Sequence, residues 1–401
     1  MLPMQTVARL RYCFKVFFIA LSCALGLFTW GALGAYAQST TADQVFVYDM
    51  STDSRLYAKN ADDRMAPSSM TKIMTAYVVF DAIKNGEIQL NDKMRVSNTA
   101  YRRGGSKMFL LQNERATILD LLKGLIIVSG NDAAITLAEG VSGTEAAFAE
   151  RMNATAQALG MRNTNFVNAS GWPNADHYST ARDIAILSVR LITDHPDFYH
   201  GLFSEREMTH NAVTQYNRNK LLTANFNALP ENFLAADGIK TGFTNDGGYG
   251  IAASAIDIGG RRVVIVMNGL SSKSTREVES EALMAWAFTE FQYHEIFRPG
   301  QIVGYAPVWL GQQNTVALHT TKGLRVTLPI KAFDNLKAEL IYQGPIEAPV
   351  YVDQQVGYIQ IAGPGIDPIQ VPVVAGESID SVGRFEQVIQ GLQYSVFGVQ
   401  N

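Results

Sequence analysis

The sequence predicts an α/β sandwich with an antiparallel sheet, followed by a small all-β domain and a terminal amphipathic helix. Three observations predict this order. Strand-like segments stand at both ends of a helical stretch within residues 44–291, so the strands can pair beside the helices. Short alternating strands separated by turn residues follow, up to about residue 380. The final segment then places its apolar side chains on one helical face.

Composition fits a folded chain of this size. The 401 residues are 47% apolar and 17% charged, a profile typical of globular proteins with room for two domains. The net charge is −4 and no basic stripe is present, so we expect no nucleic-acid partner. The sequence has no H-E-x-x-H motif, no ligand spacing among its six histidines and no phosphate-binding glycine loop. We therefore expect neither a metal nor a cofactor.

Residues 1–37 are typical of a signal peptide. Three basic residues precede an apolar run over residues 16–30, and Ala35-Tyr36-Ala37 then offers a small-residue cleavage site. The alternative is a retained membrane-spanning helix, for which the apolar run is short. We expect cleavage and export, either to the periplasm or to the outer face of the cytoplasmic membrane.

Cleavage would also change the chemistry open to the mature chain. Both cysteines, Cys13 and Cys23, lie in the leader, so cysteine catalysis and cysteine–metal sites are excluded. The leader carries three basic residues and no acidic ones, so its loss moves the net charge from −4 to −7.

Residues 38–297 are expected to form the α/β domain. Residues 44–50 alternate as a strand does, and from Pro67 onward the apolar residues recur at helical spacing, with Ser68 as the expected cap. This helix is apolar over most of its circumference, which places it in the core. Further helices are predicted at 117–128, 131–139, 144–158, 182–194 and 277–291, and strands at 249–256 and 262–269.

Arg298-Pro299-Gly300 marks a boundary, and residues 298–380 are expected to form the small β domain. Its strands are predicted at 301–309, 315–318, 324–328, 337–342, 358–361 and 369–374. No titratable cluster within it has a catalytic pattern.

Residues 381–401 form the predicted amphipathic helix. One face gathers Val382, Phe385, Val388, Ile389, Leu392, Val396 and Val399. The helix could pack on its own domain, or it could lie flat on a membrane, which we favour. Arg384 is its only basic residue, so burial of apolar surface would have to dominate peripheral membrane contact.

Three short motifs carry the chemistry. They are Ser69-Met70-Thr71-Lys72, Ser129-Gly130-Asn131 and Lys240-Thr241-Gly242. Each motif is weak evidence alone, because each has a purely structural explanation. The first could be a serine that caps a helix, the second a turn that ends a helix, and the third an edge strand that runs into a turn. Their order and contexts are more specific, since the first opens a buried helix, the second follows an apolar helix and the third adjoins strands.

The first motif suits a covalent mechanism. Ser69 and Lys72 are three residues apart on a helix, so their side chains share a face. A serine nucleophile needs a base, and lysine can serve if burial and a second cation, Lys240, lower its pKa. The backbone N–H groups of Ser69 and Phe243 could together form an oxyanion hole.

The other motifs suit substrate handling. Ser129 can pass a proton toward the leaving group, and Asn131 can hold the substrate backbone with its amide. Gly242 has no side chain, so an extended peptide can lie against the strand edge. Thr241 and a nearby arginine could bind a terminal carboxylate, for which a planar guanidinium is well suited.

The motif trio resembles that of the penicilloyl-serine transferases, which are the penicillin-binding proteins and serine β-lactamases. Longer segments resemble the D-alanyl-D-alanine carboxypeptidases specifically: residues 66–75, 104–110, 129–134 and 237–242. The resemblance extends to the β domain and the terminal helix. It implies a β-lactamase/transpeptidase-like fold for the first domain.

The resemblance also implies an activity. A serine carboxypeptidase of this kind removes the terminal D-alanine from peptidoglycan pentapeptides through an acyl-enzyme, here on Ser69, and penicillins acylate the same serine. Peptidoglycan stem peptides and β-lactam antibiotics are the implied partners. Arg276 and Arg218 match two arginines of the family near the substrate carboxylate. Phe243 departs from relatives that carry histidine there, and its proposed role uses only its backbone.

Three alternatives remain open at this point. A class A β-lactamase needs an E-x-x-L-N motif after the serine motif, whereas Glu87-Ile88-Gln89-Leu90-Asn91 precedes Ser129. A catalytically idle wall-binding protein would keep the fold without the reaction. An endopeptidase would use the same site on a longer leaving group.

Overall fold

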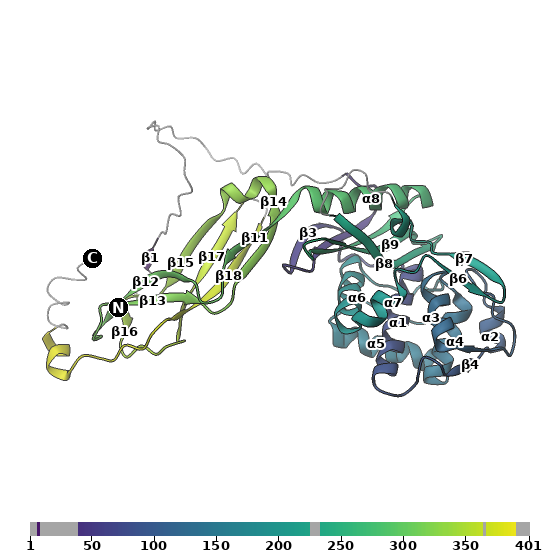
Figure 1. The fold of residues 1–401 in the computed structure, drawn as a ribbon, viewed down its shortest axis with the longest axis horizontal. Helices are drawn as coiled ribbons and strands as arrows, with labels where there is room; N and C mark the ends of the chain where they lie inside the picture. Colours follow the sequence, from purple (N-terminus) through teal and green to yellow (C-terminus); the bar gives the residue numbers. More distant parts are fainter. Residues whose placement is uncertain (1–5, 9–38, 225–232, 364–365, 390–401) are drawn as a thin grey trace. The chain divides into compact units, whose positions relative to one another are not determined.

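The computed structural model describes residues 6–8, 39–224, 233–363 and 366–389, and Figure 1 shows their helices and strands. The chain divides into two compact units. One comprises Ala37–Phe291, and the other combines Met1–Tyr36 with Gln292–Asn401. The expected leader lies outside the described ranges except for β1 (Thr6–Ala8), which pairs antiparallel with β15 (Lys337–Tyr342).

A five-stranded antiparallel sheet organises the first unit. Its order is β3 (Ser54–Lys59), β2 (Gln44–Asp49), β10 (Arg262–Leu270), β9 (Gly248–Asp257) and β8 (Phe233–Thr244). The first strands of the unit therefore pair with its last strands, which confirms the predicted antiparallel α/β sandwich. β8 stands at one edge of the sheet, so among the described residues only one of its sides is paired with another strand.

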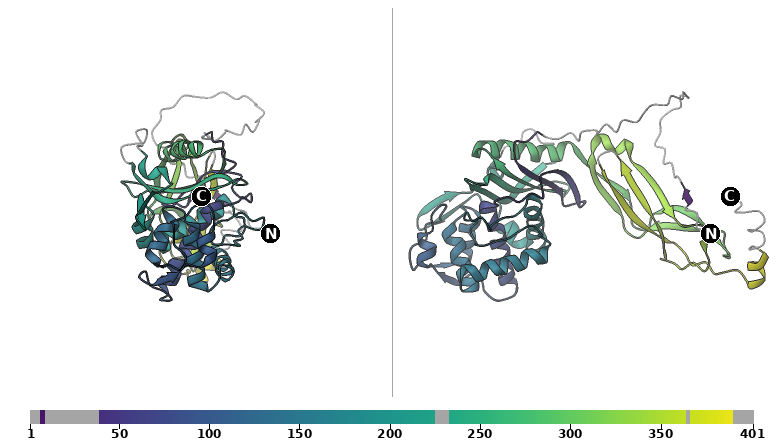
Figure 2. Two further views of the ribbon diagram at one scale, coloured as in Figure 1. Left: turned by 90° about the vertical axis from the view of Figure 1, so that its right-hand side faces the viewer. Right: turned by 180° about the vertical axis from the view of Figure 1, so that it is seen from behind.

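Helices lie on both sides of this sheet, as the view from behind in Figure 2 shows, and both faces are buried. Successive strand residues alternate between the faces: Val45 and Val47 belong to a core with α8 (Lys273–Thr289), and Phe46 belongs to a core with the helical layer. Because both faces are covered, these strands have almost no polar face, which is why the sequence shows apolar runs in this region.

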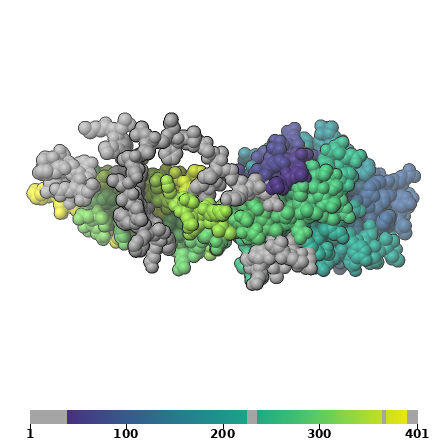
Figure 3. All heavy atoms as spheres, turned by 90° about the horizontal axis from the view of Figure 1, so that it is seen from above, coloured from purple at the N-terminus to yellow at the C-terminus, as the bar shows by residue number. Residues whose placement is uncertain are grey.

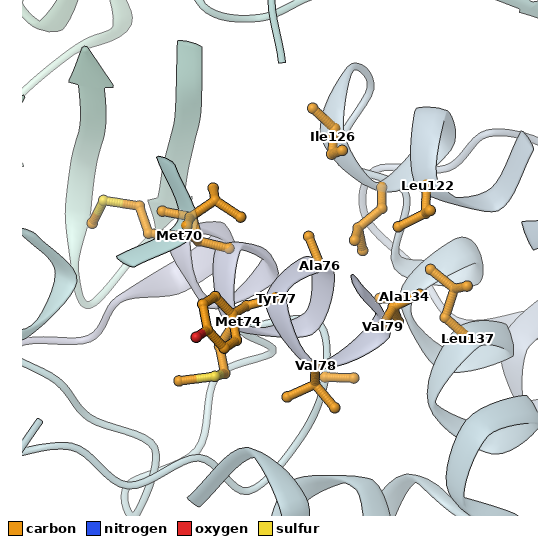
Figure 4. Packing of buried hydrophobic residues seen from close by; sticks show 14 of the residues in the cluster. Met70, Met74, Ala76, Tyr77, Val78, Val79, Leu122, Ile126, Ala134 and Leu137 are labelled. Atoms are coloured by element: carbon orange, nitrogen blue, oxygen red, sulfur yellow. The ribbon is translucent and has the colours of Figure 1, made fainter. Parts of the chain in front are cut away.

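The helix bearing the first motif lies in the middle of the unit. A 3₁₀ turn, η1 (Ser68–Thr71), leads into α1 (Lys72–Lys84), whose residues from 72 to 80 are all buried. Figure 4 shows its apolar side chains meeting those of α3 (Ile118–Ile126) and α4 (Asn131–Ser142). The packing on all sides fixes the position of the residues at its start. The other helices are α2 (Asn98–Arg102), α5 (Glu145–Leu159), α6 (Ala181–Asp194), α7 (Pro196–Leu202) and η2 (Lys220–Thr223).

One predicted cap was wrong. The Ser68 side chain makes no capping bond to η1 or α1; its Oγ lies 2.9 Å from Thr244 Oγ1. Ser68 has a φ of +50° and lies inside the turn, so its side chain faces the end of β8 instead of the helix N–H groups. Two hairpins were also not predicted, β4 (Lys93–Arg95) with β5 (Arg115–Thr117) and β6 (Glu207–His210) with β7 (Val213–Tyr216).

Side-chain bonds tie the start of this unit to α8. Figure 3 shows the purple segment that begins the unit beside the green of α8. Both Thr40 and Thr41 donate hydroxyl hydrogen bonds to Glu279, at 2.7 and 2.6 Å. Segments that are more than 200 residues apart in the sequence thus cover the same side of the sheet.

The second unit is all-β, as predicted. A seven-stranded sheet has the order β1, β15, β17 (Gln355–Gly363), β18 (Ile366–Ala375), β13 (Thr315–Thr320), β12 (Ile302–Trp309) and β16 (Ile346–Glu347). A pair, β11 (Phe291–Phe297) with β14 (Leu324–Pro329), and the 3₁₀ helix η3 (Ile330–Asn335) complete it. Its apolar core is separate from those of the first unit.

The terminal helix is seen only at its start. Residues 384–389 are helical, and Phe385, Val388 and Ile389 are exposed. Residues 390–401, with Leu392, Val396 and Val399, lie outside the described ranges. Within those ranges, none of the helices is both long and apolar enough to cross a membrane.

Candidate active site

Ser69 and Lys72 meet at the junction of η1 and α1. In a 3₁₀ turn, residues three apart are eclipsed, so the two side chains lie one above the other. Lys72 Nζ donates a 3.0 Å hydrogen bond to Ser69 Oγ. The contact expected from the spacing is present, although a 3₁₀ turn produces it and not a regular α-helix.

Lys72 is buried, and its ammonium position is fixed by three acceptors. Besides Ser69 Oγ, its Nζ donates to Asn131 Oδ1 at 2.8 Å and to the carbonyl of Ser170 at 2.5 Å. Only 1% of the residue is exposed. The pKa of Lys72 is lowered to about 7, chiefly by burial and further by the positive charge of Arg218, while the charges of Asp132 and Glu145 oppose both effects. A neutral amine is therefore accessible near neutral pH.

The second motif lies between α3 and α4, opposite the first. Ser129 has a φ of +63°, and its buried Oγ has no hydrogen-bond partner among the described residues. Asn131 begins α4; its Nδ2 donates to the carbonyl of Gly104 at 2.8 Å while its Oδ1 accepts from Lys72. Gly105, with a φ of +77°, makes this approach possible, because a Cβ there would lie 2.8 Å from Asn131 Nδ2.

The third motif lies on β8 and flanks the nucleophile from the sheet side. Lys240 and Thr241 are buried, and Lys240 Nζ donates to the carbonyl of Thr241 at 3.1 Å. Burial holds the pKa of Lys240 well below its usual range, and the charge of Lys72 acts in the same direction. A Cβ on Gly242 would lie 3.1 Å from the carbonyl of Pro67, so the strand packs closely on η1. Phe243 follows with its side chain 49% exposed.

The two predicted arginines lie near each other. Arg276, in the first turns of α8, is buried, and its Nη2 donates to the carbonyl of Arg218 at 3.5 Å. Arg218 Nη1 donates to Ser106 Oγ at 2.7 Å. The charges of Arg218 and Arg276 both lower the pKa of Lys240, so the four cations share one electrostatic environment.

The sequence interpretation missed the loop of residues 163–178. Asn168 Oδ1 accepts hydrogen bonds from the backbone N–H groups of Ser170, Gly171 and Trp172. This turn presents the Ser170 carbonyl to Lys72. The only signal was the turn-forming string Asn-Ala-Ser-Gly, which predicts a turn but not its partner.

A buried histidine fixes the same loop to the nucleophile turn. His177 Nε2 lies 2.7 Å from Thr71 Oγ1, and its Nδ1 accepts from the Val167 N–H at 3.1 Å. With Nδ1 as acceptor, Nε2 is the protonated nitrogen and donates to Thr71. Burial lowers the pKa of His177 to about 4, so the ring stays neutral and this bond persists at neutral pH.

Taken together, the geometry is suited to acyl transfer. A serine hydroxyl contacts a buried amine of lowered pKa, a second serine hydroxyl has no partner among the described residues, and the edge strand β8 packs on the turn that carries Ser69. Direct hydrogen bonds join Ser69, Lys72 and Asn131. Lys240 interacts electrostatically with Lys72 and with both arginines, since all three charges lower its pKa.

Comparison with known proteins identifies both units. Residues 32–271 match the model of peptidase family S11, described as D-alanyl-D-alanine carboxypeptidase. Residues 291–381 match the family described as penicillin-binding protein 5, C-terminal domain. The two matches together cover most of the chain.

Individual relatives agree. D-alanyl-D-alanine carboxypeptidase DacA of Haemophilus influenzae is 33% identical over 393 residues, covering 96% of this chain and 98% of that protein. The crystal structure of penicillin binding protein 5 from Haemophilus influenzae superposes with a TM-score of 0.73 at 33% identity, covering 87% of this chain and all of the other. Penicillin-binding protein D2 from Listeria monocytogenes in the cefotaxime-bound form has a TM-score of 0.56 at 30% identity, covering 62% of this chain and 98% of its own.

Proposed function

This chain belongs to the D-alanyl-D-alanine carboxypeptidase family and is a serine-type enzyme of that class, and we propose that Ser69 is the residue acylated when it removes the terminal D-alanine of peptidoglycan pentapeptides. The observation that carries the proposal is the 3.0 Å hydrogen bond between Lys72 Nζ and Ser69 Oγ. It joins a hydroxyl to a buried amine whose pKa is lowered to about 7.

Acylation then proceeds with Lys72 as the base. Neutral Lys72 accepts the proton of Ser69 as Oγ attacks the carbonyl of the penultimate D-alanine. The negative charge that develops on the carbonyl oxygen is stabilised by the backbone N–H groups of Ser69 and Phe243. When the C–N bond breaks, the departing D-alanine nitrogen takes up a proton through Ser129, whose Oγ has no partner among the described residues. Water hydrolyses the ester and regenerates Ser69.

Substrate orientation follows from the edge strand and the cations. The peptide lies along the edge strand β8, which Gly242 allows to pack closely on η1 beside Ser69. Its terminal carboxylate binds near Thr241, with the guanidinium of Arg276 and that of Arg218 within the same cationic region. The second N–H of Asn131 Nδ2 holds the substrate amide carbonyl. A free chain end is thereby favoured over an internal peptide bond.

The structure also bears on the β-lactamase alternative. Glu87 of the E-x-x-L-N match follows α1 and bonds Arg151 through both carboxylate oxygens, at 2.7 and 2.8 Å. Since α1 rises about 1.5 Å per residue, its 13 residues separate Glu87 from Lys72 by about 20 Å. Glu87 is therefore too far from Ser69 to activate a water there.

Partners and location belong to the same proposal. β-Lactam antibiotics would acylate Ser69, in keeping with the cefotaxime-bound relative. Export through the leader would bring the enzyme to its wall substrate. The exposed Phe385, Val388 and Ile389 would begin a membrane-contacting face of the terminal helix.

Mass spectrometry after incubation with benzylpenicillin tests the proposal. We expect one penicilloyl adduct, mapped to Ser69, and D-alanine release from a pentapeptide. Ser69→Ala should lose both, whereas Ser204→Ala, which changes an exposed serine on another segment, should keep both. An adduct on a different residue, or D-alanine release that survives Ser69→Ala, would exclude this nucleophile. Release that is absent from the folded wild-type protein would favour the idle wall-binding alternative.

A further inference from the structure

Two aromatic rings stand together near the end of β8. Phe243 on β8 pairs directly with Tyr249 on β9, and their ring centroids are 4.2 Å apart with an angle of 31° between the rings. Side chains of directly paired residues lie on the same face of a sheet. Tyr249 packs against the core that includes α8, so the aromatic pair belongs to the face of the sheet that α8 covers. Arg276 lies on that helix.

The polar contacts of the Arg276 guanidinium are long for a buried group. The residue is only 5% exposed, and burial lowers its pKa from the ordinary value. Among the described residues, the guanidinium makes two polar contacts, at 3.5 Å with the Arg218 carbonyl and at 4.0 Å with the Glu277 carboxylate. Charge-assisted hydrogen bonds are typically about 2.7–2.9 Å long. These two contacts are therefore too weak to fix the orientation of the guanidinium by themselves.

The ring of Tyr249 supplies a further restraint. The guanidinium carbon of Arg276 lies 5.9 Å from the Tyr249 ring centroid, within the distance of about 6 Å over which an aromatic face attracts a cation. This attraction is stronger for a buried cation than for one in water. Phe243, itself 49% exposed, contacts the partly buried Tyr249 and so removes part of that ring from water. The three side chains thus form one connected group beside Thr241.

We propose that Tyr249 is a positioning residue for recognition of the substrate carboxylate: its ring holds the Arg276 guanidinium in place, and the side chain of Phe243 supports that ring. The preference for a free carboxylate then depends on two residues that act through Arg276. The inference rests on the proposed function, since it deepens the same site. It also gives the side chain of Phe243 a role besides that of its backbone N–H.

A matched pair of thioesters tests this role. Both carry the same N-benzoyl-D-alanyl group, joined through sulfur either to thioglycolate, which ends in a carboxylate, or to thioglycolamide, which ends in a neutral amide. Attack of Ser69 on the thioester carbonyl releases a thiol from each, and a disulfide reagent detects it. The measured quantity is the carboxylate preference, defined as kcat/KM for the thioglycolate ester divided by kcat/KM for the thioglycolamide ester. Interactions that both substrates share cancel in this ratio.

Three variants examine the two rings. Tyr249→Leu should lower the carboxylate preference about five- to tenfold, because it removes the cation–π contact from a buried guanidinium. Tyr249→Phe keeps an aromatic face and should keep the preference within about twofold of wild type. Phe243→Leu should lower it about two- to threefold, and this change at an exposed side chain keeps the test available if Tyr249→Leu does not fold. Tyr305→Leu is the control at an exposed position in the second unit and should alter nothing.

Arg276→Gln shows whether the ring acts through the guanidinium. This variant alone should lower the carboxylate preference and so set the value that remains without the cation. When Tyr249→Leu is added to it, the preference should fall no further, because the ring then has no cation to hold. A further fall of fivefold or more in the double variant would show that the ring acts without Arg276 and would overturn the inference.

The remaining outcomes separate this inference from the proposed function. An unchanged preference in Tyr249→Leu, including an equal loss of rate on both thioesters, overturns the positioning role and leaves the carboxypeptidase mechanism intact. A loss in Tyr249→Phe as large as that in Tyr249→Leu also overturns it, because the hydroxyl and not the ring is then responsible. A wild-type preference near one overturns carboxylate recognition and this inference together. Absence of thiol release from both thioesters overturns the proposed function itself.

Discussion

Replacing Asn131 with aspartate perturbs the proposed base while nearly preserving the shape of its partner. Asn131 Oδ1 accepts a 2.8 Å hydrogen bond from Lys72 Nζ, and both residues are buried. In Asn131→Asp, a carboxylate oxygen takes the place of the amide oxygen. The ammonium form of Lys72 then gains an opposite charge in direct contact, so the pKa of Lys72 must rise.

The size of the rise follows from the distance. Two unit charges 2.8 Å apart attract by about 6 kcal/mol at an effective dielectric constant of about 20, and measured effects of such pairs reach about 3 pKa units. From its lowered value of about 7, the pKa of Lys72 would therefore move to about 10. The neutral fraction at pH 7 falls from about one half to about one in a thousand, which predicts acylation about 500-fold slower. At pH 9 the loss shrinks to about tenfold.

The assay is the second-order rate of acylation by a fluorescent penicillin between pH 6 and pH 9.5. The variant's rate should rise about tenfold per pH unit over a range where the wild-type rate levels off. Asn85→Asp makes the same chemical change at the far end of α1, about 20 Å away, and should keep the wild-type profile. A variant whose rate is lower by one constant factor at every pH would refute Lys72 as the titrating base, since loss of the Asn131 amide alone produces that pattern.

Two further predictions concern stability. Gly171→Ala should lower the free energy of unfolding in urea by more than about 3 kcal/mol, because the added Cβ would lie 1.7 Å from the Ser68 carbonyl oxygen at a φ of +77°. Gly160→Ala is the control: its φ of +84° is similar but its Cβ would meet open space, so the free energy of unfolding should fall by only about 1 kcal/mol. The second prediction concerns Lys72: between pH 7 and pH 10 the unfolded chain holds a proton on this residue that the folded chain has released. The free energy of unfolding of wild type should therefore rise relative to that of Lys72→Met by on the order of 1 kcal/mol per pH unit. Urea titrations of both proteins at each pH measure this difference. A difference that stays constant or falls over that range would contradict the lowered pKa.

Local pattern was sufficient to predict most of the elements and the contact between Ser69 and Lys72, although it missed the hairpins β4–β5 and β6–β7. Helical spacing located the buried α1, and the S-x-x-K spacing predicted a contact that the structure shows at 3.0 Å between Ser69 and Lys72. The strand-like segments 249–256 and 262–269 predicted β9 and β10 to within a residue or two at each end. These features depend on residues close in sequence, whose geometry is fixed by the period of the element.

The remaining contacts join residues far apart in sequence, and no period encodes them. The Ser170 carbonyl reaches Lys72 across 98 residues, and its loop is held by side-chain to backbone bonds from Asn168. The contact of Arg276 with the Arg218 carbonyl depends on where α8 crosses the sheet. Ser68 was misassigned as a cap because the sequence does not show that β8 passes within reach of its hydroxyl. Such contacts follow from tertiary packing, which overrides local preference.

The cations near Lys72 favour its proposed role as the base, and substrate binding should strengthen that role. In the unbound site, burial and the positive charge of Arg218 both disfavour the ammonium form of Lys72. The neutral amine is therefore available to accept a proton. A substrate carboxylate that binds beside Arg218 and Arg276 offsets part of that positive charge. The pKa of Lys72 then rises as the nucleophile is about to lose its proton, which favours transfer from Ser69 to Nζ. Penicillin, which also carries a carboxylate, would benefit from the same effect, whereas a peptide with an amidated end would not.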